Sequence, residues 1–271
     1  MIYNRLFVLI LLSIFLFSEK ELLAQTEKSA GEKMLYIGEE LEYEVSYSVF
    51  KLGTVKLHVL DTATSYGRFI YKIKAYIDSY TVPFVTLHQV VYIEVNPLPY
   101  TYFYSAHDVV NPEKQPFYEY QFDYNKKKIE YIKGIRPENT ITKKGEDTTN
   151  NVFQQDGLSI FYYARANVRQ NAVRNVPTYV NEEHGNTFFN FMNKIEPMEI
   201  DAVDYPVSTV AFSGKAGFVG IFGLTGDFRG WMSNDDAAIP IVAKMKVFIG
   251  NIHIELKKWK RGNWSPPKYQ K

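Results

Sequence analysis

The chain has 271 residues, and 46% of them are hydrophobic, a proportion that is sufficient to bury one large core. Its 31 basic and 30 acidic residues nearly cancel, so no overall electrostatic field attracts nucleic acid or anionic lipid. The sequence contains no cysteine, which excludes disulfides, thiolate metal sites, cysteine nucleophiles and a lipid-modified cysteine.

Residues 1–24 are typical of a secretory signal peptide. Arg5 precedes the almost wholly apolar run 6–17, and Ala24 is a small residue at the expected cleavage site. The apolar run has about 12 residues, whereas a helix needs about 20 to span a bilayer. We therefore expect an exported protein of a bacterial cell envelope, periplasmic or sent further, with no transmembrane span after signal removal. An uncleaved membrane anchor is the alternative.

Residues 25–37 are polar and predict a flexible N-terminal segment. From Gly38 onward the hydrophobic pattern has a period of two. In residues 40–49, apolar side chains at every second position alternate with Glu and Ser, which predicts a strand with one apolar and one polar face. A turn over 51–53 and a return over 54–59 predict an antiparallel partner.

The same alternation recurs to the end of the chain and predicts about eleven or twelve strands in all. The further strands are expected over 69–77, 91–95, 118–124, 128–132, 177–183, 187–195, 199–212, 241–249 and 251–259. Residues 134–150 are polar and predict an exposed loop. We expect a single β-rich domain over 38–262, followed by a C-terminal tail over 263–271.

One helix is predicted over 156–168. Asp156 can accept a hydrogen bond from a free first-turn amide as the N-cap. Leu158, Phe161, Tyr162 and Arg165 follow at helical spacing, so this stripe is expected to lie on the sheet. A sheet of this size cannot stay flat, because its twist makes it curl, split or close. The expected fold is therefore mainly β, a large curled antiparallel sheet or half-open barrel with one central helix packed on it.

Three stretches stand out together by their order and spacing: GEELEYEVSY at 38–47 with LGTV at 52–55, DGLSIFYYAR at 156–165, and WMSNDD at 231–236 leading through 239–241 to GNIHIEL at 250–256. In these stretches the chain resembles the bacterial exported family catalogued as domain of unknown function 3108. The resemblance covers about residues 38–260 and implies an exported envelope protein with an antiparallel sheet. It supplies no catalytic residues, because the family has no agreed activity.

Glycines recur at every third position from Gly214 to Gly226, with apolar residues between them. Because glycine permits unusual backbone angles, this run could form a mobile apolar lip over a ligand cavity. A long hairpin loop packed on its own sheet is the alternative. A phosphate-binding loop is excluded, because no Gly-Lys-Ser/Thr ends the run.

No catalytic or metal-binding pattern stands out, and we expect neither an enzyme nor a cofactor. The five histidines lack metal-ligand spacing, and no Gly-x-Ser-x-Gly motif is present. Asn234, Asp235 and Asp236 could hold a hard cation through oxygen, with a turn between strands as the alternative.

The leading hypothesis is a non-enzymatic binding or carrier protein for an apolar or amphipathic ligand such as a lipid, because a concave sheet rich in aromatic residues suits such ligands. An assembly partner of an envelope protein complex and an enzyme acting on envelope glycans are the alternatives. The residues expected near the cavity are Tyr43, Tyr47, Phe122, Phe161 and Phe222.

Overall fold

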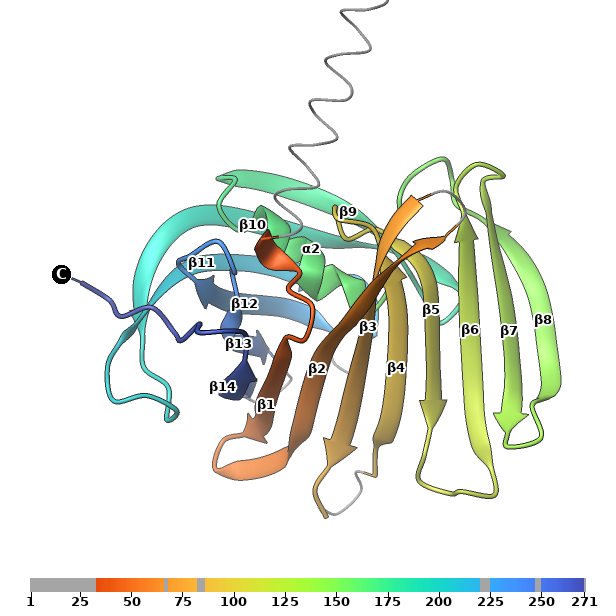
Figure 1. The fold of residues 1–271 in the computed structure, drawn as a ribbon, viewed down its shortest axis with the longest axis horizontal. Coiled ribbons are helices and arrows are strands. Elements are labelled where there is room, and N and C mark those ends of the chain that lie inside the picture. Colours follow the sequence, from red (N-terminus) through yellow and green to blue (C-terminus); the bar gives the residue numbers. More distant parts are fainter. Residues whose placement is uncertain (1–32, 66–67, 82–85, 220–224, 247–249, 271) are drawn as a thin grey trace, which may run out of the picture.

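The computed structural model describes residues 33–65, 68–81, 86–219, 225–246 and 250–270. The expected signal peptide therefore lies outside the described residues. Within them, one antiparallel sheet of 14 strands curls around the helix α2 (Figure 1). The predicted fold class, a mainly β curled antiparallel sheet with a central helix, is confirmed.

Eight strands precede the helix and six follow it. The first group comprises β1 (Glu40–Tyr47), β2 (Phe50–Ser65), β3 (Arg68–Ser79), β4 (His88–Val95), β5 (Thr101–Asp108), β6 (Gln115–Asp123), β7 (Lys128–Arg136) and β8 (Thr140–Thr148). After α2 (Ser159–Asn167) come β9 (Ala172–Val180), β10 (Glu183–Met198), β11 (Val207–Ala216), β12 (Gly226–Ser233), β13 (Pro240–Lys246) and β14 (Asn251–Lys260).

The sheet consists of two meanders joined by the first and last strands. Its order is β8-β7-β6-β5-β4-β3-β2-β1-β14-β13-β12-β11-β10-β9. Every neighbouring pair is consecutive in sequence except β1 and β14, which pair antiparallel from Glu40 opposite Lys260 to Tyr47 opposite Ile252. The edge strands β8 and β9 are the two strands that flank α2 in the sequence. Because β8 and β9 do not pair with each other, the sheet is not closed.

The polar segment 134–150 differs from its prediction as an exposed loop. It contains the end of β7 and all of β8, which pairs with β7 from Lys128 opposite Thr148 to Ile135 opposite Thr140. Alternation is missing there because β8 is an edge strand that is exposed on both faces along most of its length. Charged side chains on an edge strand prevent pairing with other chains, so the polar composition is compatible with a strand.

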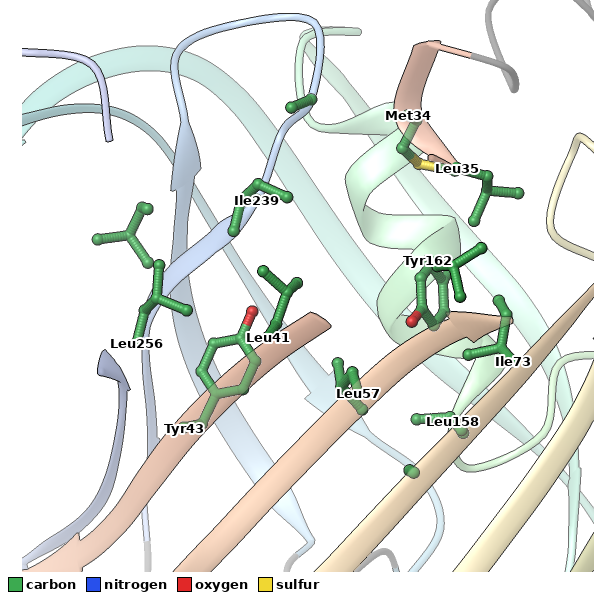
Figure 2. Close-up of a cluster of buried hydrophobic side chains, with 14 of the residues drawn as sticks. Met34, Leu35, Leu41, Tyr43, Leu57, Ile73, Leu158, Tyr162, Ile239 and Leu256 are labelled. Atoms are coloured by element: carbon green, nitrogen blue, oxygen red, sulfur yellow. The ribbon is translucent and has the colours of Figure 1, made fainter. Parts of the chain in front are cut away.

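The largest hydrophobic cluster lies on the concave side of the sheet, where α2 packs against β1, β2 and β3. Figure 2 shows Leu158 and Tyr162 of the helix beside Leu57 and Ile73 of these strands. The chain on either side of the expected domain also joins this cluster. Met34 and Leu35 are buried in it, and Trp264 packs against it.

Side chains and one linker residue join the two ends of the sheet. The backbone of Gln155, between β8 and α2, bonds to Pro177 and Tyr179 of β9, each at 2.9 Å. The Tyr120 hydroxyl of β6 donates to Glu182 in the β9–β10 turn at 2.5 Å. The Tyr179 ring lies edge-on to that of Tyr120, with centroids 5.5 Å apart. The ends of the sheet are therefore held together without a strand ladder between them.

Candidate functional site

A cavity of about 160 Å³ lies between α2 and the inner faces of β1, β2 and β10–β14. Its lining is almost wholly apolar and includes Phe189, Phe212 and Phe228 together with Ile160 of the helix. For comparison, an engineered apolar cavity of about 150 Å³ accommodates benzene. A well-formed apolar cavity is the default candidate for a ligand site, and this one can hold a short hydrocarbon segment.

Two glycine–phenylalanine pairs shape the wall formed by β11 and β12. Phe212 is opposite Gly230, and Gly214 is opposite Phe228. A Cβ atom at Gly230 would lie 2.4 Å from Cζ of Phe212, and one at Gly214 would lie 2.3 Å from Cζ of Phe228. Each ring therefore covers the glycine of the neighbouring strand, because only glycine leaves room for it.

These pairs give part of the glycine run a structural role. Gly214 lies inside β11 and Gly226 begins β12, so both ends of the run belong to the wall of the sheet. Gly220 and Gly223 lie outside the described residues. Phe218, which follows β11, lines the cavity.

The first turn of α2 is anchored to β5 through Asp156. Oδ1 of Asp156 accepts hydrogen bonds from the amides of Leu158 at 2.6 Å and Ser159 at 2.8 Å, and Oδ2 accepts one from the Thr101 hydroxyl at 2.7 Å. Burial raises the pKa of Asp156, and these hydrogen bonds counter part of the rise. The residue thus satisfies first-turn amides, as predicted, although the regular helix starts only at Ser159.

The last turn of α2 carries Arg165 into a buried ion centre formed by Glu39, Arg165 and Arg261. Arg165 donates to both carboxylate oxygens of Glu39, at 2.7 and 3.0 Å, and also to the carbonyls of Met34 and Ala237. Arg261, which follows β14, donates to Glu39 at 2.5 Å and to the Met34 carbonyl at 2.9 Å. The centre joins the N-terminal segment, the helix and the end of the last strand.

The structure places two of the predicted site residues at the cavity. Tyr43 of β1 lines it from the sheet and Phe161 of α2 lines it from the helix. Phe161 is 39% exposed, so it does not lie on the sheet as the helical stripe predicted. The helix instead turns Leu158, Tyr162 and Arg165 inward, and Phe161 faces the border between cavity and solvent.

The other predicted residues lie elsewhere. Tyr47 is half-buried at the end of β1 and is absent from the described lining of the cavity. Phe122 is buried in a separate cluster with Tyr120, Ile129 and Tyr179. Phe222 lies outside the described residues. Ligand binding by any of the five remains a prediction.

Sequence reasoning missed the aromatic wall and the buried ion centre. The wall has a signal in the sequence, since Phe212-Ser213-Gly214 and Phe228-Arg229-Gly230 share the pattern Phe-x-Gly. The sequence also contains a signal for the buried ion centre, because an arginine such as Arg165 within an apolar helical stripe requires a buried partner. Nothing local to Glu39 identifies it as that partner, since four glutamates lie between residues 39 and 44.

The turn between β12 and β13 uses Asp235 as a hydrogen-bond acceptor. Its Oδ1 accepts from the amides of Ala237 and Ala238, each at 3.1 Å, and its Oδ2 accepts from the Trp264 indole at 2.7 Å. Throughout the described part of the chain, no group of three or more His, Asp or Glu side chains could hold a metal ion. No described helix has both the length and the apolar character to cross a bilayer.

The family model described as "Protein of unknown function (DUF3108)" matches residues 42–257, most of the chain. The chain belongs to this family. The comparison of its sequence with curated proteins found no match.

The solved structures that are similar to this DUF3108 protein include the following two. One is a β-barrel-like protein of domain of unknown function DUF1849 from Brucella abortus, with a TM-score of 0.52 and 8% identity, covering 84% of this chain and 99% of that chain. The other is a protein from Bacteroides fragilis described as exported and with a YmcC-like fold. It has a TM-score of 0.32 and 9% identity, and covers 83% of this chain and 96% of that chain. At these identities the first similarity shows a barrel-like fold and nothing about activity.

Proposed function

We propose that this DUF3108 protein is an exported, non-enzymatic binding or carrier protein that takes an apolar or amphipathic ligand into the cavity beneath α2. The observation that carries the proposal is the cavity itself, whose aromatic and aliphatic lining belongs to the helix and to strands from both halves of the sheet. Apolar side chains that line a cavity lack packing partners, which is energetically unfavourable. A bound apolar ligand supplies those contacts. We place the protein in the periplasm or elsewhere in the bacterial cell envelope.

The border at Phe161 supports entry of a ligand. Phe161 lines the cavity and is partly exposed, while Ala164, one turn further, lines the cavity and is buried. The helix thus covers the cavity with a small side chain at its centre and an aromatic ring at its border. This arrangement suits a ligand that enters beside α2.

An assembly role through strand addition has less support. Of the two edge strands, β8 carries Lys143, Lys144, Glu146 and Asp147, and charges on an edge oppose pairing with another chain. The backbone of β9 is partly occupied by its bonds to Gln155.

The experiment compares a variant that fills the cavity with a matched variant on the outer face of the same helix. Ala164→Leu adds three carbons inside the cavity, whereas Ala166→Leu adds them on the exposed face. Protein purified without detergent is extracted and analysed for lipid by mass spectrometry, and a fluorescent fatty acid is titrated into each variant. We expect bound lipid, and a loss of at least about tenfold in probe affinity for Ala164→Leu alone.

Absence of both extracted lipid and probe binding would contradict the proposal. Equal probe affinities of the two leucine variants would contradict the assignment of the cavity as the binding site.

A further inference from the structure

Three buried polar atoms lie in or beside the ion centre, and one of the residues that carry them, Tyr43, also lines the cavity. They are the hydroxyl oxygens of Tyr43 and Tyr162 and the Nε atom of Arg165, and none has a hydrogen-bond partner among the described residues. All three residues are at least nine-tenths buried, with Tyr43 5% exposed and Tyr162 1% exposed. A buried polar group without a partner destabilises the fold, so a ligand group that bonds to these atoms would remove that penalty.

The three residues that carry these atoms are neighbours in the interior. The guanidinium carbon of Arg165 lies 5.3 Å from the ring centre of Tyr162. Burial raises the pKa of the Tyr43 hydroxyl, and the nearby charge of Arg165 acts against that rise. Figure 2 shows Tyr162 reaching from α2 toward the sheet and Tyr43 reaching from β1 into the interior. Tyr43 also lines the cavity, so it connects the apolar space to the charged groups.

The ion centre carries an excess of positive charge. Glu39 provides one carboxylate, while Arg165 and Arg261 provide two guanidinium groups, each paired with that same carboxylate. No other acidic side chain in the described ranges lies within ion-pair distance of either arginine. A buried positive charge that exceeds its counter-charge favours an anion nearby.

We propose that the ligand is an amphiphile with a carboxylate head, which bonds to the Tyr43 hydroxyl, the Tyr162 hydroxyl and Nε of Arg165 while its hydrocarbon segment fills the cavity. This inference rests on the proposed binding function and specifies its ligand class. A carboxylate only accepts hydrogen bonds, and the two hydroxyls and the Nε–H group can all donate. Because the three atoms are closed off from solvent, the head group reaches them from the cavity as the Tyr43 ring moves aside.

The experiment titrates three ligands of equal chain length: octanoate, 1-octanol and octylammonium. Calorimetric titration at pH 7 is performed on the wild-type protein and on Tyr43→Phe, Tyr162→Phe and Tyr179→Phe. The first two variants remove the hydroxyls at the ion centre. Tyr179→Phe removes a buried hydroxyl in the separate cluster around Phe122 and is the matched control. Circular dichroism and urea unfolding establish that each variant is folded before titration.

We expect octanoate to bind the wild-type protein at least about tenfold more tightly than 1-octanol, since hydrogen bonds to a charged acceptor are stronger than those to a neutral one. Tyr43→Phe and Tyr162→Phe should each reduce octanoate affinity about tenfold and leave 1-octanol affinity within about twofold. Tyr179→Phe should change neither affinity. Octylammonium should bind more weakly than 1-octanol, because its charge has the same sign as the excess charge of the centre.

Equal affinities for octanoate and 1-octanol in the wild-type protein would overturn the carboxylate proposal while leaving a binding function in place. Loss of octanoate affinity in all three variants alike would also overturn it, because the effect would then be a general consequence of removing buried hydroxyls. Failure of all three ligands to bind would instead contradict the proposed function itself.

Discussion

Glu39 and Arg165, 126 residues apart in the sequence, form a two-point ion pair in the interior. The side chains of both residues are 1% exposed. Desolvation of two charges is costly, and further hydrogen bonds offset part of that cost: Arg261 donates to Glu39, and Arg165 donates to the carbonyls of Met34 and Ala237. The pair therefore fixes the position of α2 on the sheet, and with it the roof of the cavity.

Replacing Glu39 should strongly destabilise the protein. Glu39→Gln leaves two buried guanidinium groups without a counter-charge, so we expect the free energy of unfolding to fall by about 3–5 kcal/mol. Urea unfolding followed by circular dichroism measures it. The matched control is Glu40→Gln, because Glu40 pairs with Lys260 at the surface, where solvent screens the pair, so the free energy of unfolding should hardly change. Similar losses in both variants would show that the buried centre is not a principal source of stability.

Removing the Glu182 carboxylate should loosen the join between the two ends of the sheet. Glu182 accepts a hydrogen bond from Tyr120 and pairs with Lys133, so Glu182→Gln weakens two contacts from β6 and β7. We expect the free energy of unfolding to fall by about 1–3 kcal/mol. Amide hydrogen exchange should accelerate relative to the wild-type protein, and more in β9 than in β3. Glu183→Gln, at the adjacent exposed position, is the control. Unchanged exchange in β9 would mean that the contacts of Glu182 do not hold the two ends of the sheet together.

Stability should depend on pH through Glu255. Burial alone would raise its pKa, but hydrogen bonds from His253, Lys257 and the Asp201 amide outweigh burial and lower the pKa from 4.5 to about 2. A folded-state pKa below the unfolded value means that the carboxylate stabilises the fold above pH 4.5. That contribution is lost as the pH falls from 4.5 toward 2.

The test is urea unfolding of the wild-type protein and of Glu255→Gln across pH 2–7. Between pH 4.5 and 2 we expect the wild-type protein to lose on the order of 2 kcal/mol more stability than the variant. If the two curves fall in parallel over this window, Glu255 has no depressed pKa.

Gly230→Ala should distort the aromatic wall of the cavity. The new methyl group would lie 2.4 Å from the Phe212 ring, so the ring must move. We expect the free energy of unfolding to fall by about 1–3 kcal/mol and the fluorescent fatty acid to bind more weakly. The control is Gly157→Ala, which also lines the cavity but has no atom within 4 Å of its Cβ position. Stability and probe affinity are measured in parallel. Equal behaviour of the two variants would show that the Phe212–Gly230 contact does not shape the site.

The alternating pattern predicted strands such as β1 and β3 well because those strands bury one face. The strand over 40–49 shows this clearly, with Leu41, Tyr43 and Val45 turned inward. The pattern missed β5 and β12, which also lie inside the sheet. The pattern could not predict β8, whose two faces are both largely exposed and therefore carry no alternation. Strand detection from periodicity thus fails at the edge of a sheet, where side chains are not sorted into two environments.

Aromatic content alone could not separate cavity residues from core residues. Tyr43 and Phe122 show the same alternation in sequence, yet Tyr43 lines the cavity and Phe122 packs against Tyr179 of β9. The difference depends on which distant strand lies across the curled sheet. That relationship is set by the sheet order, which a local pattern does not contain.

The pairing of β1 with β14 has a consequence for folding during biosynthesis. A chain leaves the ribosome from its N-terminus, so each strand from β2 to β8 can pair early with the strand that precedes it. β1 has β2 as an early partner, but its other edge stays unpaired until β14 is made, because β14 is the last strand of the sheet in chain order. Loss of β14 would divide the sheet near its middle and expose the edges of β1 and β13 at once. Clipping near residue 250 should therefore produce aggregation rather than a slightly smaller folded protein.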